Sequence, residues 1–131
     1  SIRNNATLMR SMRILVVENH ADTLRWLTLY LEELGHTVTT AQTLTEAKAA
    51  LSGSDCDVLI SDIGLPDGTG WELLEQAQLS RPIFAIAMSG FGMNADNTRS
   101  RKAGYHHHLL KPFKVAELDK MLKEAGEFAA P

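Results

Sequence analysis

An acidic residue stands in an unexpected place in the stretch DVLISDIGLPDGTG, residues 57–70, where Asp62 comes directly after an apolar run. Burying a carboxylate is costly unless a cation or hydrogen-bond donors pair with it. Other groups that can pair with charge also come at the ends of apolar runs: Glu18, Asn19, Ser89 and Lys111. Together they offer two acids, an amide, a hydroxyl and an ammonium, which would form one polar site if the ends of these runs converge.

The apolar runs are typical of β-strands. Residues 14–17 are Ile-Leu-Val-Val, the pattern of a strand that is buried on both faces. Further strands are predicted at residues 37–41, 58–60, 83–88 and 107–110. Each is followed by a segment of helical period.

The predicted helices carry recognisable start and stop signals. Leu24, Leu27, Leu31 and Leu34 recur at helical spacing, and Gly35 ends that helix. The pairs Thr43/Glu46 and Thr69/Glu72 can form capping boxes. Gly104 ends the fourth helix, and the last helix carries Val115, Leu118, Met121 and Leu122.

Five strand–helix pairs in strict alternation predict an α/β fold with a parallel sheet and helices on both faces, because parallel neighbours need crossover connections. Ligands of open α/β sheets bind beyond the carboxyl ends of the strands. Glu18, Asn19, Asp62, Ser89 and Lys111 are all expected at that edge.

Composition bounds the kinds of partner that the chain can have. The 131 residues fit one domain, and 44% hydrophobic and 22% charged residues are ordinary for a globular protein. A net charge of −3 predicts no nucleic-acid binding by this domain, and the absence of a long apolar stretch predicts no membrane contact. A single cysteine, Cys56, excludes an internal disulfide framework, so we expect a cytoplasmic protein.

Four segments in the same order resemble the receiver domain of two-component response regulators, the family of the chemotaxis receiver. They are ILVVEN at 14–19, DIGLPDGTG at 62–70, AMSG at 87–90 and LLKPF at 109–113. The resemblance implies a doubly wound, flavodoxin-like sheet of order 2-1-3-4-5. It also implies a phosphorelay in which a sensor histidine kinase or phosphotransfer domain is one partner and an output domain or protein is the other.

The resemblance assigns roles to single residues. Asp62 would accept the phosphoryl group. Lys111 would pair with Asp62 and then with the phosphate, and Ser89 would hydrogen-bond the phosphate. The implied cofactor is Mg²⁺, held by Glu18, Asn19, Asp62 and the backbone carbonyl of Gly64. Ser89 and His108 would form the switch that reports phosphorylation to the surface.

Two positions depart from the usual family pattern. The family usually has two acids where this chain has Glu18 and the neutral Asn19, so we expect weaker Mg²⁺ binding. The aromatic residue expected three positions before the lysine is His108. In the run His106-His107-His108, at most the first and third share a face of a strand, so structural roles are favoured over a metal site.

The boundaries expected from the sequence are an N-terminal arm or linker at 1–12, the receiver domain at 13–125 and a tail at 126–131. The chain is either a stand-alone receiver or one cut from a longer protein such as a hybrid histidine kinase.

Two other functions are considered. One is a degenerate receiver that docks partners without phosphorylation. The reason to consider it is Asn19, which stands where the family usually has a second acid. The other is an aspartate-nucleophile phosphohydrolase, which needs a second acid where this chain has Gly64. Beyond its own phosphorylation and dephosphorylation, no turnover of a separate substrate is expected.

Overall fold

The computed structural model describes residues 10–53, 55–90 and 97–129. Strands and helices alternate along the chain, as the hydrophobic pattern predicts. The main strands are β1 (Arg13–Val17), β2 (Thr37–Ala41), β3 (Val58–Asp62), β6 (Phe84–Ser89) and β7 (His107–Leu110). The helices are α2 (Ala21–Glu33), α3 (Leu44–Leu51), α4 (Gly70–Glu75), α5 (Asn97–Ala103) and α6 (Val115–Ala129).

The five main strands form one parallel sheet in the order β2-β1-β3-β6-β7. Numbered among themselves, this is the order 2-1-3-4-5, so the predicted doubly wound topology is confirmed. The register places Val17 beside Ser61 and Asp62 beside Met88. The carboxyl ends of the central strands therefore lie at one edge of the sheet.

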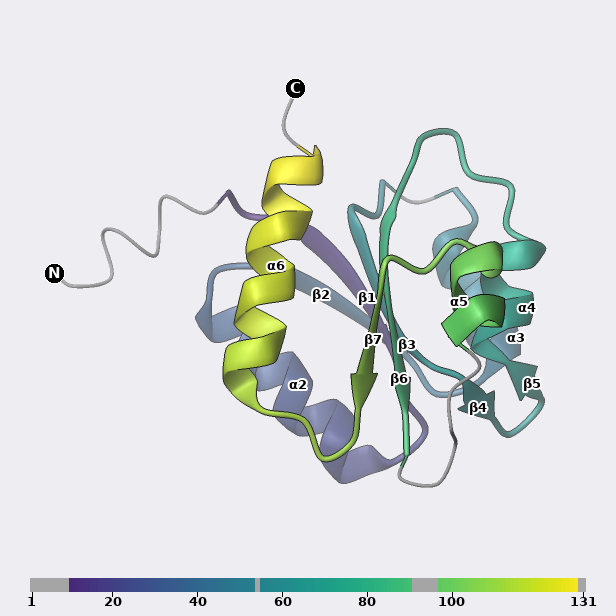
Figure 1. The fold of residues 1–131 in the computed structure, drawn as a ribbon, viewed down its shortest axis with the longest axis horizontal. Helices are drawn as coiled ribbons and strands as arrows, with labels where there is room; N and C mark the ends of the chain where they lie inside the picture. The colour runs from purple at the N-terminus through teal and green to yellow at the C-terminus, as the bar shows by residue number, and fades with distance from the viewer. Residues whose placement is uncertain (1–9, 54, 91–96, 130–131) are drawn as a thin grey trace, which may run out of the picture.

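Helices cover both faces of the sheet, with α2 and α6 on one face and α3, α4 and α5 on the other (Figure 1). Alternate strand residues supply two separate cores. In β3, Val58 and Ile60 pack with the α2 and α6 side, whereas Leu59 packs with the other side. All five residues of β3 are buried, which fits the continuous apolar run that leads into Asp62.

The residues predicted to begin and end the helices do so in the structure. Gly35 follows α2 with a φ of 97°, a left-handed conformation that suits glycine. Thr43 and Thr69 cap α3 and α4, each accepting a hydrogen bond from the backbone N–H three residues on. One half of the first capping box differs, because the Glu46 carboxylate accepts from the N–H of Gln42 at 2.8 Å rather than from the cap residue.

A two-stranded hairpin, β4 (Gly64–Leu65) with β5 (Gly68–Thr69), joins β3 to α4 and is not anticipated by the sequence pattern. Its turn residue Asp67 reaches the start of α3, where its carboxylate accepts hydrogen bonds from the N–H of Leu44 at 2.6 Å and of Thr45 at 3.0 Å. The segment after Asp62 is thus tied to a neighbouring helix.

The ends of the described chain pack onto the domain. Met12 is buried in the core beside α2 and α6, and α6 continues past Gly126 to Ala129. The domain boundaries expected from the sequence stay a prediction. In the part of the chain that the structure describes, no helix has both the length and the apolar character needed to cross a membrane.

Candidate functional site

Backbone hydrogen bonds between neighbouring strands fix the positions of three predicted site residues. The N–H of Glu18 donates to the carbonyl of Ala41 at 3.0 Å. Directly after Asp62, the N–H of Ile63 donates to the carbonyl of Met88 at 2.9 Å. The N–H of Lys111 donates to the carbonyl of Ser89 at 2.8 Å. Residues far apart in the sequence are thereby held at the same edge of the sheet.

Glu18, Asp62 and Lys111 form one buried ionic cluster. The Glu18 side chain is fully buried, and Asp62 is only 4% exposed. The ammonium Nζ of Lys111 lies 2.7 Å from Oδ1 of Asp62 and also donates to Oε1 of Glu18. The charge that the sequence places after an apolar run is therefore paired, as predicted, by the lysine.

This pairing is incomplete, because two carboxylates share one ammonium. Burial and the hydrogen bond and charge of Glu18 raise the pKa of Asp62 to about 7, although Lys111 acts in the opposite direction. Burial opposes ionisation of Glu18 too, but hydrogen bonds with Asp62 and Lys111 outweigh it and lower the pKa of Glu18. With Lys111 present, one of the two carboxyl groups ionises readily. Ionisation of the second is opposed unless another cation binds.

Ligand atoms of Glu18, His20 and Asp62 all lie within 4.8 Å of one another, a spacing suited to a bound metal ion. Oxygen ligands and an excess of negative charge are what Mg²⁺ requires, so the residues present fit the cation that the sequence implies. Asn19 is exposed at the end of β1, and Gly64 lies in β4 two residues after Asp62.

The side chains of Ser89 and His108 contact each other. Oγ of Ser89 lies 2.6 Å from Nε2 of His108, and Ser89 is 2% exposed. Burial lowers the pKa of His108, which favours the neutral ring. Among the described residues, Nδ1 of His108 is buried without a hydrogen-bond partner. The two predicted switch residues are therefore directly connected.

The neighbouring histidines have separate contacts. His106 stacks on Phe84 with ring centroids 4.5 Å apart. Nε2 of His107 lies 2.6 Å from the Glu124 carboxylate. These contacts agree with the structural roles expected for the histidine run.

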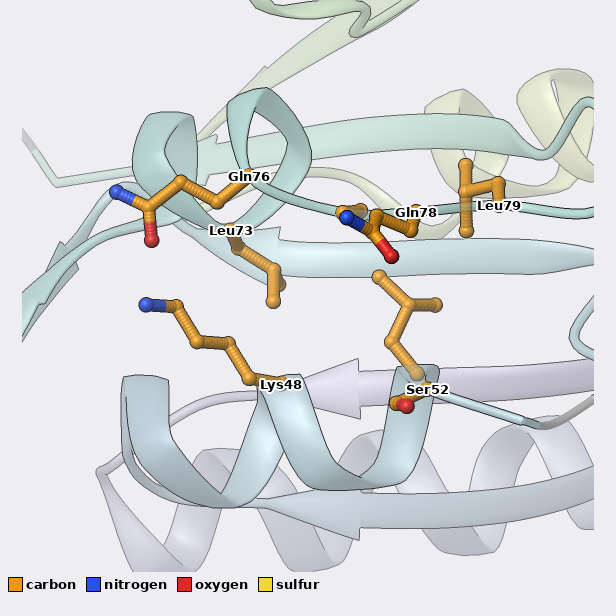
Figure 2. A pocket seen from close by; sticks show the side chains of 8 residues that line it. Lys48, Ser52, Leu73, Gln76, Gln78 and Leu79 are labelled. Carbon is orange, nitrogen blue, oxygen red and sulfur yellow. The ribbon is translucent and has the colours of Figure 1, made fainter.

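Two of the hollows that the described residues form bear on where a ligand or partner could bind. A groove of about 240 Å³ separates α3 from α4 and the segment after it, with Lys48 and Leu73 entering from opposite sides (Figure 2). None of the predicted site residues lines it. A more open hollow of about 470 Å³ lies beside the cluster and is lined by Asp22, Thr23, Trp26, Lys111, Pro112 and Phe113.

His20 and Asp67 were not singled out by sequence reasoning. His20 lies two residues after Glu18, and its place next to a candidate metal ligand is the signal that could have identified it. Asp67 acts through a contact with α3, 23 positions earlier in the chain, which no local pattern reveals.

A parallel sheet wound on both faces, with buried acids and a lysine at its carboxyl edge, is a doubly wound α/β domain of the class that binds ligands at this edge. The chain belongs to the response regulator receiver domain family, whose model matches residues 14–123. It is thus a receiver domain of the kind found in two-component response regulators.

Individual relatives agree with this assignment. The KDP operon transcriptional regulatory protein KdpE of Escherichia coli (strain K12) is 31% identical over 112 residues, which are 86% of this chain and 50% of that protein. The transcriptional regulatory protein CusR of the same organism is 34% identical over 111 residues, 82% of this chain and 48% of that protein. The chain spans about half the length of these two curated relatives.

A solved structure gives the same result for the fold. The CheY-like response regulator receiver domain protein from Methanospirillum hungatei JF-1 is 28% identical, with a TM-score of 0.79. The match covers 92% of this chain and 100% of that chain.

Proposed function

We propose that this domain accepts a phosphoryl group on Asp62 from a phosphohistidine of a partner kinase or phosphotransfer domain. The observation that carries the proposal is the buried cluster of Glu18, Asp62 and Lys111, in which two carboxylates share one ammonium. A cation at this site would complete the charge balance. Burying charged groups costs desolvation free energy, and groups with perturbed pKa values cluster at functional sites.

In the transfer, a carboxylate oxygen of Asp62 attacks the phosphorus atom. The bond from phosphorus to the histidine nitrogen breaks as the new oxygen–phosphorus bond forms, and the imidazole leaves. Such transfers depend mainly on positioning and on stabilising charge on the phosphoryl oxygens. A bound Mg²⁺, held by Glu18, Asn19, Asp62 and the Gly64 carbonyl, would supply part of this charge stabilisation. Lys111 already lies 2.7 Å from the accepting carboxylate and would pair with the transferred group.

The Ser89–His108 contact is the proposed route from the site to the surface. In the tautomer in which Nε2 of His108 accepts from the Ser89 hydroxyl, that hydroxyl must break its 2.6 Å contact with His108 before it can donate to a phosphoryl oxygen. The imidazole would then lose its hydrogen-bonding partner and change position. Phosphorylation would thereby favour one of two arrangements of Ser89, His108 and the adjoining surface, which an output domain or protein could recognise.

The hollow beside Lys111 is the proposed approach for the phosphoryl donor. Trp26 is 42% exposed there and lies within 6.1 Å of Phe113 between ring centroids. Exposed aromatic side chains next to a reactive group are suited to a transient protein contact.

Incubation with acetyl phosphate and Mg²⁺, followed by intact-mass measurement, tests the function. We expect a single phosphoryl adduct that decays slowly and is lost in Asp62→Asn. Asp22→Asn, which removes an exposed carboxylate near the same hollow, serves as the matched control and should still form the adduct. Rapid turnover of small phosphate esters would instead indicate a hydrolase, and no adduct with any divalent cation would indicate a docking module. Either result would overturn the proposal.

A further inference from the structure

His20 lies beside the carboxylate pair and has no role in the function proposed above. Its ring Nδ1 is 3.2 Å from Oε2 of Glu18, and its backbone N–H donates to the same oxygen at 3.0 Å. The three potential ligand atoms of Glu18, His20 and Asp62 lie within 4.8 Å of one another. An imidazole nitrogen thus stands at the mouth of a site otherwise made of oxygen atoms.

The His20 ring is available for binding. His20 is the residue that precedes α2, a position where side chains often cap the helix, but its side chain makes no capping hydrogen bond. The side chain is 77% exposed, whereas that of Glu18 is fully buried. The ring can therefore approach a cation from the solvent side while the two carboxylates hold it from inside.

The donor set has a consequence for metal selectivity. Mg²⁺ prefers oxygen ligands, especially carboxylates, and the position after Glu18 here offers only the neutral amide of Asn19. Imidazole favours cations such as Co²⁺, Ni²⁺ and Zn²⁺, which also exceed lighter divalent metals in general affinity. Compared with the usual pattern of two acids, this chain has an amide in place of one carboxylate and an imidazole in addition. The potential ligands are therefore a mixture of nitrogen and oxygen atoms rather than oxygen atoms alone.

We propose that His20 is a metal ligand of this site and that it shifts the preference of the site from Mg²⁺ toward transition-metal cations. This inference rests on the proposed function only in placing a divalent cation between Glu18 and Asp62. It concerns which cation binds, and it requires no phosphoryl transfer.

The test measures binding of Mg²⁺ and of Co²⁺ to the metal-free chain by calorimetry. We expect Co²⁺ to bind about tenfold or more tightly than Mg²⁺, a difference of roughly 1.4 kcal/mol. His20→Ala should remove this preference by weakening Co²⁺ binding while Mg²⁺ affinity stays unchanged. Asp62→Asn should weaken both metals, because it removes a ligand that they share.

The matched control is His107→Ala, which removes a histidine that pairs with Glu124 outside the ionic cluster. A Co²⁺ preference that survives His20→Ala, or that is lost equally in His107→Ala, would overturn the proposal, as would equal affinity for both metals in the unaltered chain. A second readout is direct: with Zn²⁺, long-range proton–nitrogen NMR should show a shift of a His20 ring nitrogen.

The two proposals can fail separately. Loss of the acetyl phosphate adduct with retained Co²⁺ selectivity would remove only the phosphoacceptor role. An Asp62 adduct without any effect of His20→Ala on Co²⁺ binding would remove only the role of His20.

Discussion

Asp62 carries a charge that its immediate surroundings do not fully neutralise. Lys111 supplies one positive charge, but it is shared with the fully buried Glu18. Burial of two acids against one base costs free energy that an entirely structural cluster could avoid with apolar side chains. The proposed cation would relieve this imbalance.

Asn19 is the residue at which the charge of this site is most easily changed. One charge pair at about 4 Å in an effective dielectric of about 20 is worth on the order of 4 kcal/mol before solvation is counted. Asn19→Asp should therefore tighten Mg²⁺ binding by about tenfold or more, allowing for the exposure of this position. Calorimetric titration of both chains with Mg²⁺ measures the change.

Gln42→Glu is the control for a general charge effect, because Gln42 is exposed just after β2 at the same edge of the sheet. It should leave Mg²⁺ affinity nearly unchanged. Equal affinities of the unaltered chain and Asn19→Asp would contradict the expectation that the amide weakens the site.

The core of the site was predictable at the level of residues, and its periphery was not. Glu18, Asp62 and Lys111 lie at or just after the ends of strands, and parallel strands must bring their carboxyl ends to one edge. No comparable rule singles out His20, because a histidine before a helix is common and only its distance from Glu18 makes it notable.

At the scale of elements, the hairpin of β4 and β5 links Asp62 to two helices. It leads into α4, and Asp67 in its turn binds the N-terminus of α3. Close packing at Gly70 completes the link, because the Tyr105 hydroxyl donates to the Gly70 carbonyl at 2.6 Å. The loop that follows the proposed phosphoacceptor is thus held on two sides.

Gly70→Ala tests how tightly this loop is packed. A Cβ at Gly70 would lie 2.4 Å from the carbonyl oxygen of Asp62 and 3.1 Å from the hydroxyls of Ser61 and Tyr105. Because the closest of these atoms belongs to the backbone, we expect a loss of about 1–3 kcal/mol in the free energy of unfolding. Urea denaturation followed by circular dichroism measures it.

Gly64→Ala is the matched control, since a Cβ there meets no atom within 4 Å among the described residues. Its free energy of unfolding should fall much less. If the two variants were equally stable, the close contact at Gly70 would not constrain the loop.

Sequence patterns predicted the long elements better than the short ones. Strands β2 and β7 have the predicted bounds, because each lies between clear helix and turn signals. The strands of the hairpin have two residues each, too few to show an alternating pattern. Their position depends on the contact of Asp67 with α3, which is a property of the folded chain.

At the scale of the whole molecule, His36 connects the start of β1 to the turn after α2. It is 5% exposed, and its Nδ1 accepts a hydrogen bond from the N–H of Met12 at 3.1 Å. Burial lowers the pKa of His36 from its ordinary value of 6.5. The folded domain therefore contains the neutral imidazole.

This burial predicts a stability that falls in mild acid. Below pH 6.5 the unfolded chain takes up a proton at His36 that the folded domain excludes, so the free energy of unfolding decreases as pH falls. One such proton contributes up to about 1.4 kcal/mol per pH unit. Urea denaturation at a series of pH values should show a smaller decrease in His36→Gln than in the unaltered chain.

The same slope in His36→Gln and in the unaltered chain would show that His36 does not contribute to the loss of stability.

The contact between Lys111 and Glu18 joins residues 93 positions apart, one following the first strand and the other following the last. Contacts of such long sequence separation carry a large loop-closure cost and depend on the chain between them being in place. During synthesis, Asp62 emerges long before the lysine that must accompany it. A nascent or truncated chain would display the aspartate without its ammonium, so competence to receive a signal would arise only when folding is complete.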